Sequence, residues 1–145
     1  MKALTAPMQQ LGEFEEILRK IRTNRGVLQV SGCIDPQKPH FISCAAEGYD
    51  CRLIITYSDL RARELYENYR FFDRDVLYFP AKDLIFFQAD IHSNLLEQQR
   101  IAVLKALAER KNVTVITTMA ACMNHLMPSE IWQKQVLTFA PGDVL

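Results

Sequence analysis

One short segment carries residue types that could bind phosphate: VSGCIDPQKPHF, residues 30–41. A nucleotide-binding phosphate loop reads G-x-x-x-x-G-K-[ST]. Its glycine amides surround the phosphates, its lysine contacts the outer phosphates, and its hydroxyl holds magnesium. With Gly32 at the first glycine, Lys38 takes the lysine position. Two of the four fixed positions of the motif are therefore present.

The other two positions oppose a bound nucleotide. Gln37 stands where a second glycine would let the backbone approach the phosphates closely. Pro39 replaces the Ser or Thr, which removes the magnesium ligand and one backbone N–H from the start of the following helix. Asp35 and Pro36 add a negative charge and a fixed φ inside the loop. We predict a degenerate phosphate loop without nucleotide; the plain alternative is a surface connection that binds nothing.

Composition limits the classes of partner. The chain has 145 residues, 49% of them hydrophobic, with 17 basic and 17 acidic side chains. This is typical of one globular domain, and the zero net charge argues against strong binding to nucleic acid. No apolar run approaches the roughly 20 residues of a membrane span, and MKALTAPMQQ lacks the apolar stretch of a signal peptide. We therefore expect a cytoplasmic protein without membrane contact.

The cysteines and histidines show no spacing typical of a metal or redox site. No C-x-x-C motif or histidine pair occurs, so reduced, packed thiols are the simpler interpretation. We predict no metal ion and no role as ligand or base for these scattered side chains: Cys33, Cys44, Cys51, Cys122, His40, His92 and His125.

Helices and strands are predicted to alternate along the chain. Apolar spacing indicates helices over 8–23, 41–47, 94–111 and 119–127. A further helix is predicted to follow a cap at Ser58 and to turn its apolar side chains inward: Ala62, Leu65, Tyr66 and Tyr69. Apolar and β-branched runs indicate strands over 27–30, 53–55, 75–80, 112–121 and 135–139. The run over 112–121 is apolar and β-branched nearly throughout, which is typical of a strand covered by helices on both faces. Such alternation favours an α/β fold in three layers, a mostly parallel sheet with helices on both faces.

Several longer stretches resemble a known family. Residues 78–132, from YFPAKDLIFFQAD to MPSEIW, and VLTFAPGD at 136–143 resemble the N-terminal UvrB-homology module of bacterial transcription-repair coupling factors, the Mfd family. IITYSDLRARELYEN is similar to that family's second strand and helix, and LEQQRIAVLKAL to its helix with a central arginine. The module is itself similar to the nucleotide-excision-repair subunit UvrB. The resemblance starts near Val27 and is strongest from Tyr78 onward.

The resemblance implies a P-loop-NTPase-like fold whose phosphate loop is degenerate, whereas the loop of UvrB is intact. It implies an N-terminal helix over 1–25, a first subdomain over 26–135, and at 136–145 the start of a next subdomain that is otherwise absent. The parent would be an ATP-dependent DNA translocase, with ATP and magnesium held in separate motor domains. Its implied partners are stalled RNA polymerase, DNA, its own neighbouring domains, and UvrA through the adjoining subdomain.

Arg100 invites a structural hypothesis. It falls within an apolar stripe formed by Leu96, Val103 and Leu107. It could pair with Asp83 or Asp90 and fix the preceding loop, or its stem could cover core surface while its charge reaches water. Both alternatives stay open from the sequence.

Other candidate groups favour structural roles. The aromatic cluster Tyr78, Phe79, Phe86 and Phe87 lacks the interleaved basic residues of a base-stacking surface, so we expect core packing or cover by neighbouring domains. The carboxylate pairs Glu15 with Glu16 and Asp73 with Asp75 are expected to face solvent. VSGC is not a nucleophile elbow. We therefore predict no enzymatic activity for this chain.

Two functions remain. The favoured one is a non-catalytic interaction subdomain of a DNA-repair ATPase. The alternative is an ATP-binding domain of a UvrB-like helicase core with altered phosphate contacts. Gln37 and Pro39 favour the first.

Overall fold

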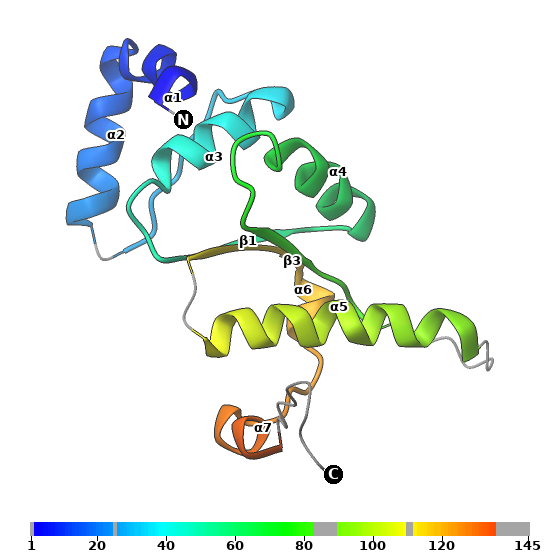
Figure 1. Ribbon diagram of the computed structural model, residues 1–145. Coiled ribbons are helices and arrows are strands. Elements are labelled where there is room, and N and C mark those ends of the chain that lie inside the picture. Colours follow the sequence, from blue (N-terminus) through cyan, green and yellow to red (C-terminus); the bar gives the residue numbers. More distant parts are fainter. Residues whose placement is uncertain (1, 25, 83–89, 110–111, 136–145) are drawn as a thin grey trace.

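A three-stranded parallel sheet lies at the centre of the protein (Figure 1). The computed structural model describes residues 2–24, 26–82, 90–109 and 112–135. The strands are β1 (Cys51–Thr56), β2 (Val76–Phe79) and β3 (Val113–Thr118), in the order β1-β3-β2. Helices α3 (Lys38–Ala45) and α4 (Asp59–Tyr69) lie on one face and α5 (Asp90–Ala108) lies on the other. The predicted α/β fold, with helices on both faces of a parallel sheet, is confirmed.

The central strand β3 explains the sheet order. All six of its residues are buried, and β-branched side chains that pack on both faces favour this position. Ile116 joins the core on the α4 side, whereas Val113 and Val115 join the core on the α5 side. This alternation follows the two-residue period of a strand.

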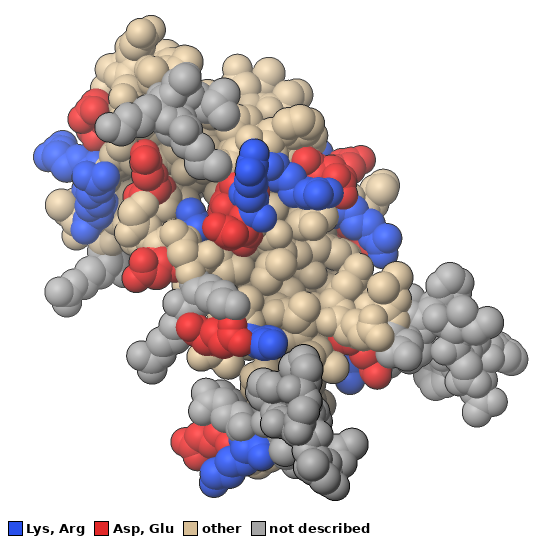
Figure 2. All heavy atoms as spheres, viewed as in Figure 1, with Lys and Arg blue, Asp and Glu red and all other residues tan. Residues whose placement is uncertain are grey.

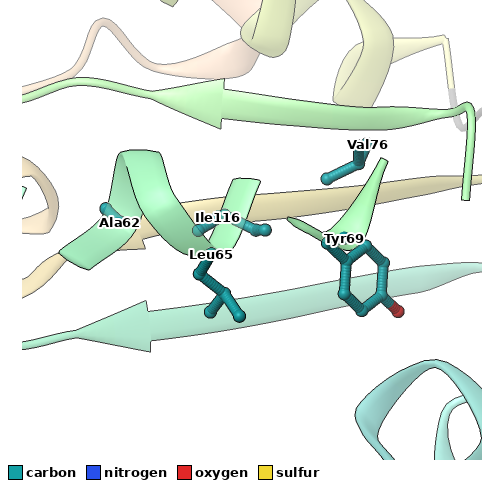
Figure 3. Packing of buried hydrophobic residues seen from close by; sticks show 5 residues of the cluster. All are labelled: Ala62, Leu65, Tyr69, Val76 and Ile116. Atoms are coloured by element: carbon teal, nitrogen blue, oxygen red, sulfur yellow. The ribbon is translucent and has the colours of Figure 1, made fainter. Parts of the chain in front are cut away.

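The core on the α4 side is built from regularly spaced helix residues. Ala62, Leu65 and Tyr69 lie three and four residues apart, so they share one face of α4, as predicted. They pack against Val76 and Ile116 (Figure 3). The predicted cap is also confirmed, because the Ser58 hydroxyl accepts a hydrogen bond from the Arg61 N–H at 3.3 Å.

The N-terminal segment forms two helices where one was predicted. These are α1 (Lys2–Gln9) and α2 (Gly12–Thr23). Gly12 is a poor interior helix residue, and it begins the second helix after a turn at Gln10 and Leu11. Phe14 is the buried residue of α2, and its ring packs edge-on against Phe41 of α3, with centroids 5.8 Å apart.

The predicted strand over 27–30 is wrong. Residues 27–30 have no strand pairing, and the side chain of Val27 is 98% exposed. A four-residue run that buries so little apolar surface does not offset the entropy lost on ordering it as a strand.

Other helix boundaries differ from prediction by several residues. Helix α3 begins before residue 41 because Pro39 fits the first turn, where no backbone donor is needed. Helix α5 begins at Asp90, earlier than predicted, and α6 (Met119–Cys122) ends well before residue 127. Helix α7 (Ser129–Gln135) follows; the strand predicted over 135–139 lies outside the described residues apart from Gln135, which ends α7.

Candidate functional site

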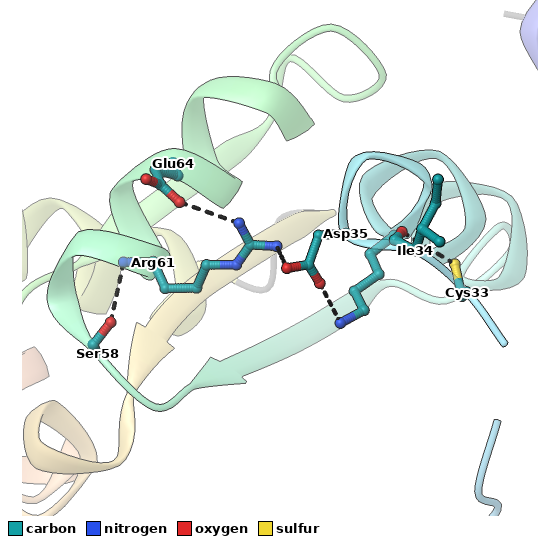
Figure 4. A network of polar contacts seen from close by, with 7 residues as sticks. Cys33, Ile34, Asp35, Ser58, Arg61 and Glu64 are labelled. Atoms are coloured by element: carbon teal, nitrogen blue, oxygen red, sulfur yellow. Dashed lines mark hydrogen bonds and ion pairs between the residues drawn. The ribbon is translucent and has the colours of Figure 1, made fainter. Parts of the chain in front are cut away.

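The segment that resembles a phosphate loop precedes α3 and lies against the start of α4 (Figure 4). Gly32 has φ +86°, a left-handed conformation that favours glycine. Asp35–Gln37 then forms a single 3-10 turn, η1, which leads directly into α3. The loop therefore keeps the first glycine of the motif in a conformation that needs glycine.

The second half of the loop has no backbone requirement for glycine. Gln37 has φ −85° and ψ −21°, a right-handed conformation open to any residue. Pro39 is buried in the first turn of α3 and contributes no N–H there. The backbone of η1 is thus a helical turn and not an open cradle of amides.

The lysine of the loop is already paired. Lys38 Nζ lies 2.5 Å from Asp35 Oδ1, three residues earlier. Arg61 of α4 approaches the same carboxylate, with Nη2 3.3 Å from Oδ2, and its Nη1 lies 3.1 Å from Glu64. Figure 4 shows the Asp35 carboxylate beside the Arg61 guanidinium, with Glu64 on the other side of Arg61.

The charges of this network balance. Two carboxylates, Asp35 and Glu64, meet two cations, Lys38 and Arg61. The hydrogen bond from Lys38 and the charges of Arg61 and Lys38 lower the pKa of Asp35, so the carboxylate stays ionised at neutral pH. An incoming phosphate would have to displace Asp35 or accept its repulsion. Each charged side chain of this network therefore already has a partner of opposite charge.

A second polar group, not predicted from sequence, lies where β2 meets α4. Tyr78 of β2 donates its hydroxyl to the Asp59 carboxylate, and Arg63 binds the same carboxylate at 2.8 Å. Burial, followed by the bond to Asp59, raises the pKa of Tyr78 to about 12. The phenol therefore stays protonated and acts as a donor, not as a base. Nineteen residues separate Tyr78 from Asp59, so no local motif could have indicated this contact.

A third group joins the amino ends of the strands. Asp73 accepts a hydrogen bond from the buried Thr114 hydroxyl at 2.6 Å and lies 3.4 Å from Arg52 Nη2. Its side chain is only 15% exposed. The expectation that Asp73 faces solvent is therefore wrong, because folding brings β1 and β3 against the turn before β2. Asp75 is exposed as predicted.

Arg100 is buried, with 4% exposure, so the alternative in which its charge reaches water is wrong. Its Nη1 donates to the Pro80 carbonyl at 2.5 Å, and its guanidinium carbon lies 4.1 Å from the centroid of the Phe79 ring. Asp83 and the side chain of Asp90 lie outside the described residues, so pairing with them stays a prediction. Arg100 joins α5 to the end of β2.

The remaining candidates are distributed through the fold. Phe79 is a core residue and Tyr78 is half-buried, as the core-packing hypothesis predicted, while Phe86 and Phe87 lie outside the described residues. Glu15 and Glu16 are exposed, as expected. The four cysteines carry free thiols. In the described part of the chain, no cluster of three or more His, Cys, Asp or Glu side chains could hold a metal ion.

The visible surface carries mixed charge. Figure 2 shows acidic and basic side chains interspersed over the face that it displays, with uncharged surface between them. Within the described ranges, no helix combines the length and apolar character needed to cross a membrane. Comparison with known proteins gave no matching family model and no matching curated protein.

Proposed function

We propose that this chain is the first subdomain of the N-terminal UvrB-homology module of a transcription-repair coupling factor. In this proposal residues 26–135 form a P-loop-NTPase-like subdomain that is not catalytic. The parent is a cytoplasmic, ATP-dependent DNA translocase that removes stalled RNA polymerase and recruits UvrA for nucleotide excision repair. Its ATP and magnesium are bound in separate motor domains.

The observation that carries this proposal is the ion pair between Lys38 and Asp35, at 2.5 Å. In an intact phosphate loop the lysine is available to the outer phosphates. Here Arg61, a residue of α4, forms a second ion pair with the Asp35 carboxylate. A domain that only binds other domains does not need an unpaired lysine in this loop, whereas an ATPase needs one to contact the phosphates.

A calorimetric titration of the chain with ATP and magnesium tests the proposal. We expect no binding heat up to millimolar nucleotide for the wild-type chain or for Lys38→Ala. Lys20→Ala is a matched control, because Lys20 is an exposed lysine of α2 that pairs with Glu16. Saturable heat that disappears in Lys38→Ala and persists in Lys20→Ala would contradict the proposal.

That contrary result would support the alternative, an ATP-binding domain of a UvrB-like helicase core. The specific observation in its favour is that the loop keeps Gly32 in a left-handed conformation and Lys38 at the start of a helix. Under this alternative, phosphate would displace Asp35 from Lys38. Competition by pyrophosphate in the same titration would identify the phosphates as the group recognised.

A further inference from the structure

A pocket of about 390 Å³ lies between α5 and the segment that contains α7. Figure 1 shows α7 on the side of α5 away from the sheet. The volume is within the range of small-molecule sites, about 300–1,000 Å³. Its apolar lining comes from both segments: Ile101, Leu104, Leu126, Met127 and Trp132.

The same pocket carries an excess of cationic side chains. Lys82 and Arg100 line it together with one acidic residue, Glu97, and with His125. No described carboxylate lies within ion-pair distance of Arg100, and its Nη2 atom has no hydrogen-bond partner among the described residues. A buried guanidinium without a countercharge is costly, so the site favours an anion nearby.

The apolar lining and the cationic side chains of this pocket together fit one class of ligand. We propose that this pocket binds a small organic acid, with its apolar body between α5 and α7 and its carboxylate near Arg100 and Lys82. Burial lowers the pKa of Arg100, because a guanidinium removed from water is less stable in its charged form. This site is separate from the loop at Lys38, and the inference does not depend on the function proposed above.

The chain contains one tryptophan, Trp132, and it lines the pocket. Its fluorescence is therefore sensitive to a ligand bound in this pocket. We would titrate the full chain with 3-phenylpropionate and, in parallel, with 3-phenylpropanol, which has the same apolar body without the charge. We expect a saturable fluorescence change and an affinity for the acid at least about tenfold greater. At surface-like dielectric, one cation a few ångströms away suffices for that ratio.

Substitutions at exposed pocket residues should change ligand binding without unfolding the chain. Lys82 is exposed, so Lys82→Met should preserve the fold; we expect it to weaken the acid about threefold and to leave the alcohol unchanged. Lys105→Met is the matched control, because Lys105 is an exposed lysine of α5 outside the pocket. Ile101→Asp, at a half-exposed pocket position, should abolish the preference for the acid.

Three results would overturn the proposal. Fluorescence that does not saturate would mean that no small ligand binds. Equal affinity for the acid and the alcohol would mean that the guanidinium already has a countercharge, as the predicted pairing with Asp83 or Asp90 would supply. An unchanged affinity in both Lys82→Met and Ile101→Asp would place the bound acid elsewhere.

Discussion

Asp73 is expected to hold the amino end of the sheet together, and Asp73→Ala tests this. The carboxylate accepts one hydrogen bond from the Thr114 hydroxyl at 2.6 Å and one from the Asp75 N–H at 2.9 Å. It also lies 3.4 Å from Arg52, with both side chains 15% exposed. Three parts of the chain, namely β1, β3 and the turn before β2, therefore meet at one side chain.

The expected cost follows from these three contacts. Thr114 is fully buried, so its hydroxyl would lose its acceptor at a cost of about 1–3 kcal/mol. The ion pair with Arg52 adds at most about 1 kcal/mol, and the turn contact with Asp75 about 0.5 kcal/mol. Because neighbouring contacts are not additive, we expect Asp73→Ala to lower the free energy of unfolding by about 3 kcal/mol.

Urea unfolding followed by circular dichroism measures this change. Asp73→Asn keeps an oxygen for Thr114 and removes the charge, so we expect a loss of only about 1 kcal/mol. Asp75→Ala is the matched control, because the Asp75 carboxylate is exposed, whereas the side chains of Thr114 and Arg52 contact Asp73. The substitution keeps the backbone carbonyl of residue 75 that accepts from the Thr114 N–H, and it should change stability by less than about 0.5 kcal/mol.

A double-mutant cycle isolates the central hydrogen bond. Thr114→Val removes the hydroxyl while keeping the shape of the side chain, so Asp73→Ala should cost about 1–2 kcal/mol less in that background. If Asp73→Ala unfolds at the wild-type urea concentration, or if the cycle shows no coupling, the hydrogen bond does not stabilise the sheet and the reasoning is refuted.

Three further predictions concern the carboxyl side of the sheet. Folding raises the pKa of Tyr78 to about 12, so the protonated phenol stabilises the fold fully below pH 10 and less as pH rises toward 12. Between these pH values the free energy of unfolding of Tyr78→Phe should therefore fall less than that of the wild-type chain. Asp35, whose pKa is lowered chiefly by Lys38, should titrate below its ordinary range by carboxyl NMR, and Lys38→Ala should move its midpoint upward, whereas an unchanged midpoint would contradict the pairing. Ser58→Ala should cost about 1 kcal/mol in urea unfolding, since it removes the cap of α4; no loss would mean that solvent satisfies the Arg61 N–H equally well.

Local patterns in the sequence predicted much of the fold. The apolar, β-branched run of β3 indicated a strand covered on both faces, and the spacing of Ala62, Leu65 and Tyr69 indicated the buried face of α4. Ser58 indicated where that helix begins. Each of these signals lies within one turn or one strand, so neighbouring residues are sufficient to specify it.

The errors arose where distant parts of the chain decide the outcome. Residues 27–30 have the composition of a strand, but a strand also needs a neighbour, and none pairs with them. Asp73 looked like a turn residue at the surface until Thr114 and Arg52, from two strands, enclosed it. The contact between Tyr78 and Asp59 likewise depends on how β2 lies against α4.

In the segment over 30–41, comparison with the phosphate-loop motif alone leaves out a charged residue that pairs with the motif lysine. Gln37 and Pro39 are the positions that depart from the pattern, yet both are compatible with the local backbone, which is helical at each. The residue that changes the charge of the site is Asp35, a position that the motif leaves unspecified. Arg61, from the separate helix α4, forms a second ion pair with that carboxylate. We therefore expect the Asp35 carboxylate, which pairs with Lys38, to oppose phosphate binding together with the two missing motif residues.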